Sequence, residues 1–113
     1  MLFKGTERRN AYEIAREIDA VGGSLNAFTG KEYTCFYART LRKDMDLALD
    51  VLADMFKESL FNEEDIEREK YVIMQEVKMV EDNPEEYIYD MFNASYFESH
   101  PLGLPILGRE KNI

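Results

Sequence analysis

The sequence is poor in several features that would assign a protein to a particular class. It has 113 residues and one cysteine, Cys35, which excludes an internal disulfide and fits a reducing compartment. No apolar run approaches the length of a membrane-spanning helix, and the first residues, MLFKGTERRN, lack the apolar centre of a signal peptide. Repeats and low-complexity tracts are also absent. We therefore expect one small folded domain, or part of a larger one.

Positive charge is scarce, and its shortage is local. The net charge is −9, and residues 63–90 alone carry 11 acidic and 3 basic side chains. Such a chain repels nucleic acid and anionic membranes, so neither is expected as a partner. The acidic block is either a solvated face or a local field that attracts cations or basic peptides, and composition does not choose between them.

Apolar and aromatic residues, at 45% and 12%, are sufficient to bury a core. In the first half, Asn10 and Glu13 are spaced as in a capping box, which predicts the start of a helix. Gly22-Gly23 marks the end of that helix. Its apolar positions recur at helical spacing: Ala11, Ile14, Ala15 and Ile18. Aromatic and β-branched residues in 24–29 and 32–40, around a turn at Gly30-Lys31, then predict a β-hairpin.

The second half predicts three helices followed by an irregular C-terminal loop. The first covers 44–56 with an apolar stripe of Met45, Ala48, Leu49, Leu52 and Phe56. The second opens at Asn62, and Asn83-Pro84 both ends it and caps the third. The third helix is expected to bury Tyr87, Ile88, Met91 and Phe92. The whole order, helix, hairpin and three helices, predicts an incomplete α/β two-layer fold.

Two acids stand out on the predicted helix that follows Asn62. Glu69 and Glu76 are seven residues apart, so two helical turns place them on one side at a rise of roughly 10 Å. A helical wheel puts both inside the apolar arc, between positions occupied by valines. A buried carboxylate must be protonated, paired or bound to a metal. The alternative is that the arc is only partly covered, so that both acids reach solvent.

Four segments carry a family resemblance in the expected order: MLFKGT, SLNAFTGKEYT, EREKYVIMQEVKMVEDNP and HPLGLPILGREKNI. Together they resemble the pitrilysin-type (M16) zinc peptidases, which include the mitochondrial processing peptidase and small bacterial processing proteases. The resemblance covers nearly the whole chain. It implies the two-layer α/β fold of that family, with residues 1–113 forming the central part of one peptidase domain.

The resemblance also implies roles for individual residues. Glu76 corresponds to the glutamate that is the third protein ligand of the catalytic Zn²⁺, and Glu69 to an acid that assists catalysis beside the metal. Asn26 and Ala27 match the edge strand that pairs with the backbone of an extended peptide substrate. An ordinary edge strand is the alternative for these two residues. Glu32, in the following turn, is a weaker candidate for the same role.

The sequence departs from the family pattern in its zinc motif. The inverted motif H-x-x-E-H supplies two histidine ligands and the general base, and it is absent here. Met1 corresponds to the residue directly after the second histidine. The one histidine, His100, has no metal role in the family and is expected to be a loop or packing residue. These 113 residues alone are therefore expected to hydrolyse nothing. A domain cut inside its active-site helix should also expose apolar surface, so the isolated fragment is expected to be poorly soluble or to aggregate.

Three interpretations follow. The first is a fragment of a zinc metalloendopeptidase that cleaves extended peptides and works with a second M16-type domain or subunit, as a dimer. The second is a non-catalytic M16-like subunit for substrate capture or assembly, and the third an unrelated α/β interaction domain. Family habit favours the bacterial cytoplasm, with the mitochondrial matrix as the alternative. The sequence upstream of Met1 would separate the first two interpretations.

Overall fold

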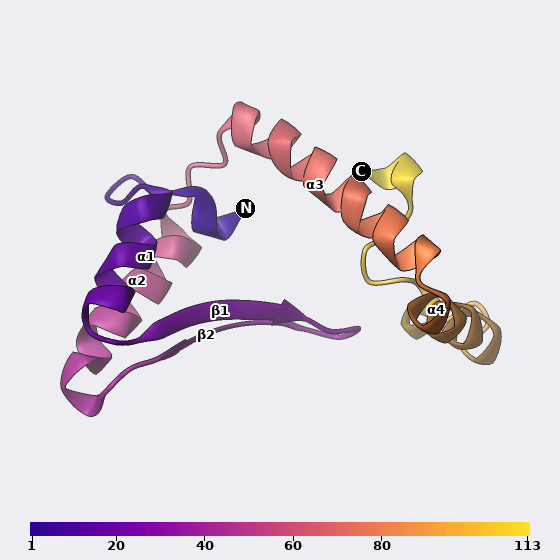
Figure 1. Cartoon of the computed structure of the whole chain (residues 1–113), viewed down its shortest axis with the longest axis horizontal. Helices are drawn as coiled ribbons and strands as arrows, with labels where there is room; N and C mark the ends of the chain where they lie inside the picture. Colours follow the sequence, from indigo (N-terminus) through magenta and orange to yellow (C-terminus); the bar gives the residue numbers. More distant parts are fainter. The chain divides into compact units, whose positions relative to one another are not determined.

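The chain folds into four helices and a hairpin (Figure 1), in a computed structural model that describes every residue except the side chain of Lys111. The helices are α1 (Ala11–Ala20), α2 (Met45–Lys57), α3 (Glu63–Asp82) and α4 (Pro84–Tyr96), and the strands are β1 (Ser24–Thr29) and β2 (Thr34–Arg39). This order confirms the prediction. Two compact units form, one from residues 1–28 and 34–66 and the other from residues 29–33 and 67–113.

Helix α1 begins and ends as its sequence predicts. The Asn10 side chain accepts a hydrogen bond from the Glu13 amide at 2.9 Å, and the Glu13 carboxylate accepts one from the Asn10 amide at 2.8 Å. At the other end Gly22 adopts φ 68°, a conformation that glycine reaches without strain. Gly23 lies so close to Thr40 that a Cβ would approach its methyl carbon to 2.8 Å. Two adjacent glycines are therefore needed where the chain turns into β1.

The hairpin contains the two predicted strands, with a longer turn than the sequence suggested. β1 covers the predicted residues, whereas β2 begins at Thr34 rather than at residue 32. The difference arises because the turn extends to Tyr33, whose carbonyl accepts a hydrogen bond from the Gly30 amide at 2.8 Å. β1 and β2 form a two-stranded sheet.

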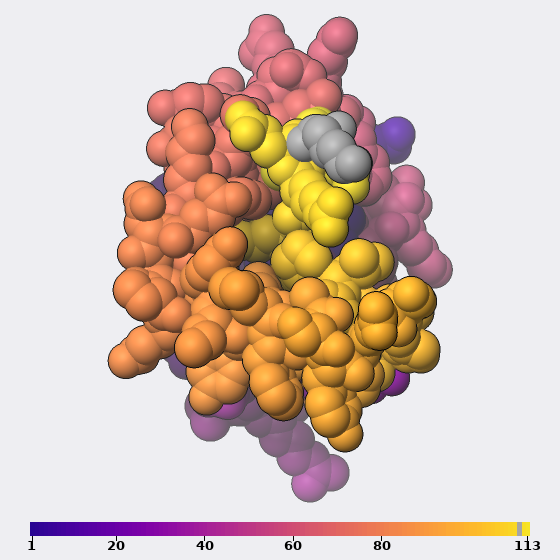
Figure 2. Space-filling model, turned by 90° about the vertical axis from the view of Figure 1, so that its right-hand side faces the viewer, coloured from indigo at the N-terminus to yellow at the C-terminus, as the bar shows by residue number. Residues whose placement is uncertain are grey.

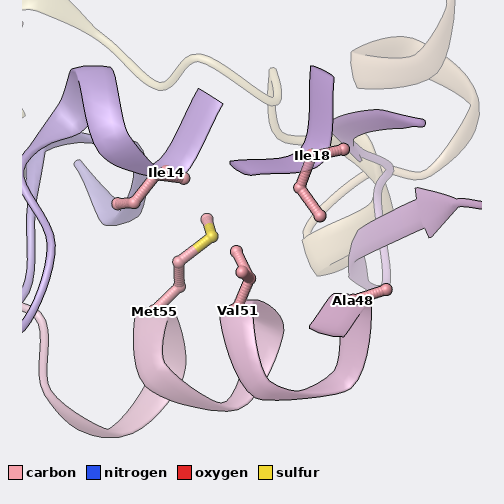
Figure 3. Close-up of a cluster of buried hydrophobic side chains, with 5 residues drawn as sticks. All are labelled: Ile14, Ile18, Ala48, Val51 and Met55. Carbon is pink, nitrogen blue, oxygen red and sulfur yellow. The ribbon is translucent and has the colours of Figure 1, made fainter. Parts of the chain in front are cut away.

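The core of the first unit lies between α1 and α2. Figure 3 shows Ile14 and Ile18 of α1 opposite three side chains of α2. These three are Ala48, Val51 and Met55. Each large side chain removed from water contributes about 1.5–3 kcal/mol, so this contact supplies much of the unit's stability.

The structure corrects the apolar stripe predicted for α2. Met45, Leu49 and Phe56 are exposed, and the buried face includes Asp54 instead. Asp54 can lie on this buried face because its carboxylate forms ion pairs with arginines near the N-terminus of the chain. Phe56 still packs edge-on against the ring of Phe36, with ring centroids 5.1 Å apart.

In the second unit, α3 ends at Asp82 and α4 starts with the predicted cap. The Asn83 side chain accepts a hydrogen bond from the Glu85 amide at 3.1 Å, and Pro84 takes the first helical position. The C-terminal segment, yellow in Figure 2, lies against α3 and α4, and all three line one hollow.

The predicted burial of the α4 stripe is wrong. Its members are all exposed: Tyr87, Ile88, Met91 and Phe92. Tyr87 and Met91 line the hollow, and no described residue covers this face fully enough to bury it. None of the described helices combines the length and apolar character needed to cross a bilayer.

Candidate metal-ligand and peptide-binding residues

Helix α3 carries both acids that the sequence singled out. It is continuous from Glu63 to Asp82, so Glu69 and Glu76 lie on one side, two turns apart. The structure therefore brings these two residues onto one helical face, as predicted from their spacing.

The expected burial of this pair is not what the structure shows. Glu76 is exposed and Glu69 is half-buried, and their neighbours Val72 and Met79 are exposed by 41% and 70%. The apolar arc is present in the sequence, but no described residue buries it. The alternative interpretation, in which the arc is only partly covered, is the correct one for this chain.

The exposed carboxylate of Glu76 is chemically suited to a zinc ion, which binds carboxylate oxygens at about 2.0–2.2 Å. It is also insufficient alone, since a catalytic zinc ion takes three protein ligands. Among the described residues, no three histidine, cysteine, aspartate or glutamate side chains gather in a way that could hold a metal. Glu76 therefore fits one ligand position, and the remaining ligands would have to come from other residues.

Asn26 and Ala27, the candidate peptide-binding residues, lie in the middle of β1. Asn26 is exposed, and its side-chain oxygen accepts a hydrogen bond from the Ala27 amide at 2.8 Å. In the described part of the chain β1 pairs with β2 alone, which leaves its other edge without a neighbouring strand. An extended peptide could add to such an edge. Glu32 is exposed in the hairpin turn.

Within the second unit, Lys31 of the hairpin turn contacts α4 and the C-terminal segment. Its ammonium donates a hydrogen bond to the Leu104 carbonyl at 2.6 Å and lies 3.8 Å from a carboxylate oxygen of Asp90. Nothing in the sequence pattern indicated this contact, because its partners are about 60 and 70 residues away along the chain.

The second unit also contains a cavity of about 770 Å³ between α3, α4 and the C-terminal segment. Much of its lining is apolar, including Val77 and Val80. Three acids also line it: Glu81, Asp90 and Glu110. His100 lies on it too. Its Nδ1 accepts a hydrogen bond from the Leu102 amide at 3.2 Å, so it caps a short turn. The prediction that His100 is a loop residue is confirmed.

An ion cluster around Asp54 was missed by the sequence analysis. The Asp54 side chain is fully buried, and its carboxylate accepts hydrogen bonds from Arg8 Nε at 2.9 Å and Arg9 Nη1 at 2.8 Å. Asp50, one turn earlier, pairs with the same two arginines. The signal was present: an acid directly before Met55 in the apolar run VLADMF falls on the buried face, by the argument applied to Glu69 and Glu76.

A comparison with known families agrees with this architecture. The family model for insulinase-type peptidases (peptidase family M16) matches residues 1–110. This chain belongs to that family.

The M16 chain has close bacterial relatives. It is 48% identical, over its full length, to the uncharacterized zinc protease YmxG of Bacillus subtilis, of which it covers 28%. It is 50% identical over 108 residues to an uncharacterized zinc protease of Streptomyces coelicolor, covering 96% of this chain and 24% of that protein. The M16 chain thus spans about a quarter of the length of these relatives.

Solved structures confirm the fold. A protease from Helicobacter pylori superposes with a TM-score of 0.92 at 22% identity, over 98% of this chain and 27% of that one. An inactive domain of an M16 peptidase from Pseudomonas fluorescens gives a TM-score of 0.88 at 19% identity, over 100% of this chain and 28% of that one. The predicted α/β fold of the M16 type is therefore correct.

Proposed function

We propose that the complete protein is a zinc-dependent metalloendopeptidase and that this chain supplies part of its active site. The observation that carries the proposal is the pair of acids on one face of α3, in a chain whose M16 match covers residues 1–110. Support also comes from relatives at 48% and 50% identity that are named zinc proteases.

In this proposal Glu76 is a zinc ligand and Glu69 acts beside the metal. Glu76 is exposed on α3, so its carboxylate can reach an ion held by residues outside this chain. Glu69 is half-buried one heptad earlier, where a second negative charge favours cationic species near the site. When bound, Zn²⁺ would supply a water of lowered pKa and polarise the scissile carbonyl.

We further propose extended peptides as the substrate class. β1 has an edge without a neighbouring strand in the described part of the chain, and Asn26 and Ala27 lie at its centre. Backbone hydrogen bonds along such an edge hold a peptide extended with little demand on its sequence. A second M16-type domain or subunit would enclose the substrate, and the bacterial relatives favour a cytoplasmic setting.

The test compares the full-length protein with its Glu76→Gln variant for zinc stoichiometry and peptide cleavage. Glutamine keeps the size of the side chain and removes the negative charge, so zinc content and cleavage should both fall at least tenfold. Glu67→Gln is the matched control, because Glu67 lies on the opposite side of α3 in an exposed pair with Lys70. This control should keep both properties.

Unchanged zinc stoichiometry in Glu76→Gln would remove Glu76 as a ligand. A full-length protein that binds no zinc at all would favour the alternative, a non-catalytic M16 subunit for substrate capture or assembly. The sequence that precedes Met1 in the complete protein gives an independent answer, since an intact H-x-x-E-H motif is required for the catalytic interpretation.

A further inference from the structure

The turn of the hairpin carries a lysine whose ammonium group is held by two acceptors. Lys31 Nζ donates a hydrogen bond to the Leu104 carbonyl at 2.6 Å and lies 3.8 Å from Asp90 Oδ1. The Lys31 side chain is 25% exposed, whereas that of Lys43 is 76% exposed. A hydrogen bond from a charged donor is stronger than one between neutral groups. The ion pair with Asp90 adds little, because it is long and both side chains reach solvent.

The Leu104 carbonyl is a fixed point, because the turn before it packs tightly on α4. Gly103 is buried, and a Cβ at this position would lie 2.9 Å from the Phe97 carbonyl oxygen. The Gly103 amide donates a hydrogen bond to the His100 carbonyl, and the His100 amide donates one to the Phe97 carbonyl, both at 2.9 Å. Asp90 lies on α4 itself. Both acceptors of Lys31 therefore belong to α4 and to the segment fastened to its end.

The hairpin is packed differently along its length. Away from the turn, Leu25 of β1 and Phe36 and Ala38 of β2 pack against the α1–α2 core. At the turn, residues 32–34 are exposed. A two-stranded hairpin without a packing partner is at best marginally stable in water. The turn thus depends on polar contacts, of which the hydrogen bond from Lys31 is one.

We propose that Lys31 is a positioning residue for extended peptides bound along β1. The inference rests on the proposed function, in which Asn26 and Ala27 form the peptide-binding edge. These two residues lie between Leu25, which packs on the core, and the turn that Lys31 holds. Lys31 acts through the backbone of the turn and not by contact with the peptide.

A held turn favours binding because a peptide pairs with a strand edge through successive backbone groups. An edge that bends or frays must be ordered when the peptide binds, and this ordering reduces the affinity. A turn that is already fixed removes part of that cost. The edge contacts the peptide equally before and during cleavage, so its positioning changes KM and leaves kcat as it was.

The experiment measures, by fluorescence anisotropy, how a fluorescein-labelled pool of random decapeptides binds the full-length protein, with chelator present to prevent cleavage. Lys31→Met keeps the length of the side chain and removes its charge, and should raise the dissociation constant about fivefold. Lys31→Arg keeps a charged donor and should bind as the parent protein does. Lys57→Met makes the same change at an exposed lysine that ends α2, and should leave the constant unchanged.

Two further measurements separate positioning from a general loss of folded protein. The Gly30 amide donates a hydrogen bond to the Tyr33 carbonyl at 2.8 Å, so its hydrogen exchange reports opening of the turn and should accelerate in Lys31→Met. With zinc restored, Lys31→Met should raise KM about fivefold at constant kcat, whereas a loss of folded protein would lower kcat at constant KM.

Each outcome decides the question. Faster exchange at Gly30 together with weaker peptide binding in Lys31→Met supports the positioning role, and unchanged peptide binding overturns it. Weaker binding without faster exchange overturns it too, as does equal weakening in Lys57→Met or Lys31→Arg. A parent protein that binds the peptides without cleaving them overturns the endopeptidase proposal alone, because the binding comparison still applies. A parent protein that binds no peptide overturns both.

Discussion

Asp54 combines full burial with a carboxyl group that stays charged. Burial alone raises the pKa of this carboxyl, but the hydrogen bonds from Arg9, Thr6 and Arg8 outweigh it and lower the pKa below its ordinary 3.8. Hydrogen bonds from Arg9 and Arg8 lower the pKa of Asp50 in the same direction. In acid the folded chain therefore holds fewer protons at these sites than the unfolded chain.

This difference predicts a loss of stability in acid. Above the unfolded value of 3.8 the stabilisation is fully present, and it is lost as the pH falls through the lower folded pKa values. In full-length protein with chelator present, the melting temperature should fall below about pH 4. Asp50→Asn should make that fall shallower, and Asp46→Asn should leave it as steep. Parallel curves for all three proteins would contradict the prediction.

At the scale of elements, the ends of helices are set by local hydrogen bonds, while their buried faces are set by partners elsewhere. α1 has a complete capping box between Asn10 and Glu13, and α4 starts at Pro84 with Asn83 as its N-cap. By contrast, α3 and α4 contain no buried residue among those described, although both have apolar arcs. Capping needs only neighbours in the chain, whereas burial of a face needs a second surface.

We expect Asn10→Ala to loosen α1. Loss of the cap removes the acceptor for the Glu13 amide and costs about 1 kcal/mol, so amide hydrogen exchange at Ile14 should accelerate about fivefold if α1 opens locally. Asp19→Ala is the control. An acid near the C-terminus of a helix does not favour the helix dipole, so its removal should not accelerate exchange at Ile14. Exchange at Ile14 that is equal in parent and Asn10→Ala protein would show that the cap does not limit opening.

At the scale of the molecule, this chain exposes far more large apolar side chains than it buries. The buried hydrophobic residues of the described chain are five: Ile14, Ile18, Ala48, Val51 and Met55. Exposed ones occur on α2, α3 and α4, with Met79 and Tyr96 each 70% exposed. Exposed apolar side chains in such number mark an interface or an aggregation-prone surface.

We therefore predict that residues 1–113, expressed alone, form a polydisperse, self-associating species. Light scattering after size-exclusion chromatography would measure this, with the full-length protein as the control. The full-length protein should be monodisperse, since its additional chain can cover these faces. A cooperative, monomeric fold of residues 1–113 would contradict the prediction and show that the small α1–α2 core is sufficient.

The roles of Glu69, Glu76, Asn26 and Ala27 are still predictions, whereas several expectations about burial were wrong. The pattern of Met45, Leu49 and Phe56 indicated a core face that the structure leaves exposed. Periodicity identifies an apolar stripe but not the surface it packs on, and it ignores a polar side chain such as Asp54 that is buried with its partners.

By itself the sequence determined the local features: the order of elements, the capping box, the glycine turn after α1 and the spacing of Glu69 and Glu76 on one helical side. These features depend on interactions between residues that are close together in the sequence, so the local sequence predicts them. Only the tertiary structure decided that Asp54 meets Arg8 and Arg9, more than 40 residues away, and that the acid-bearing face of α3 is open. Long-range pairing depends on how distant segments pack, which no local pattern encodes.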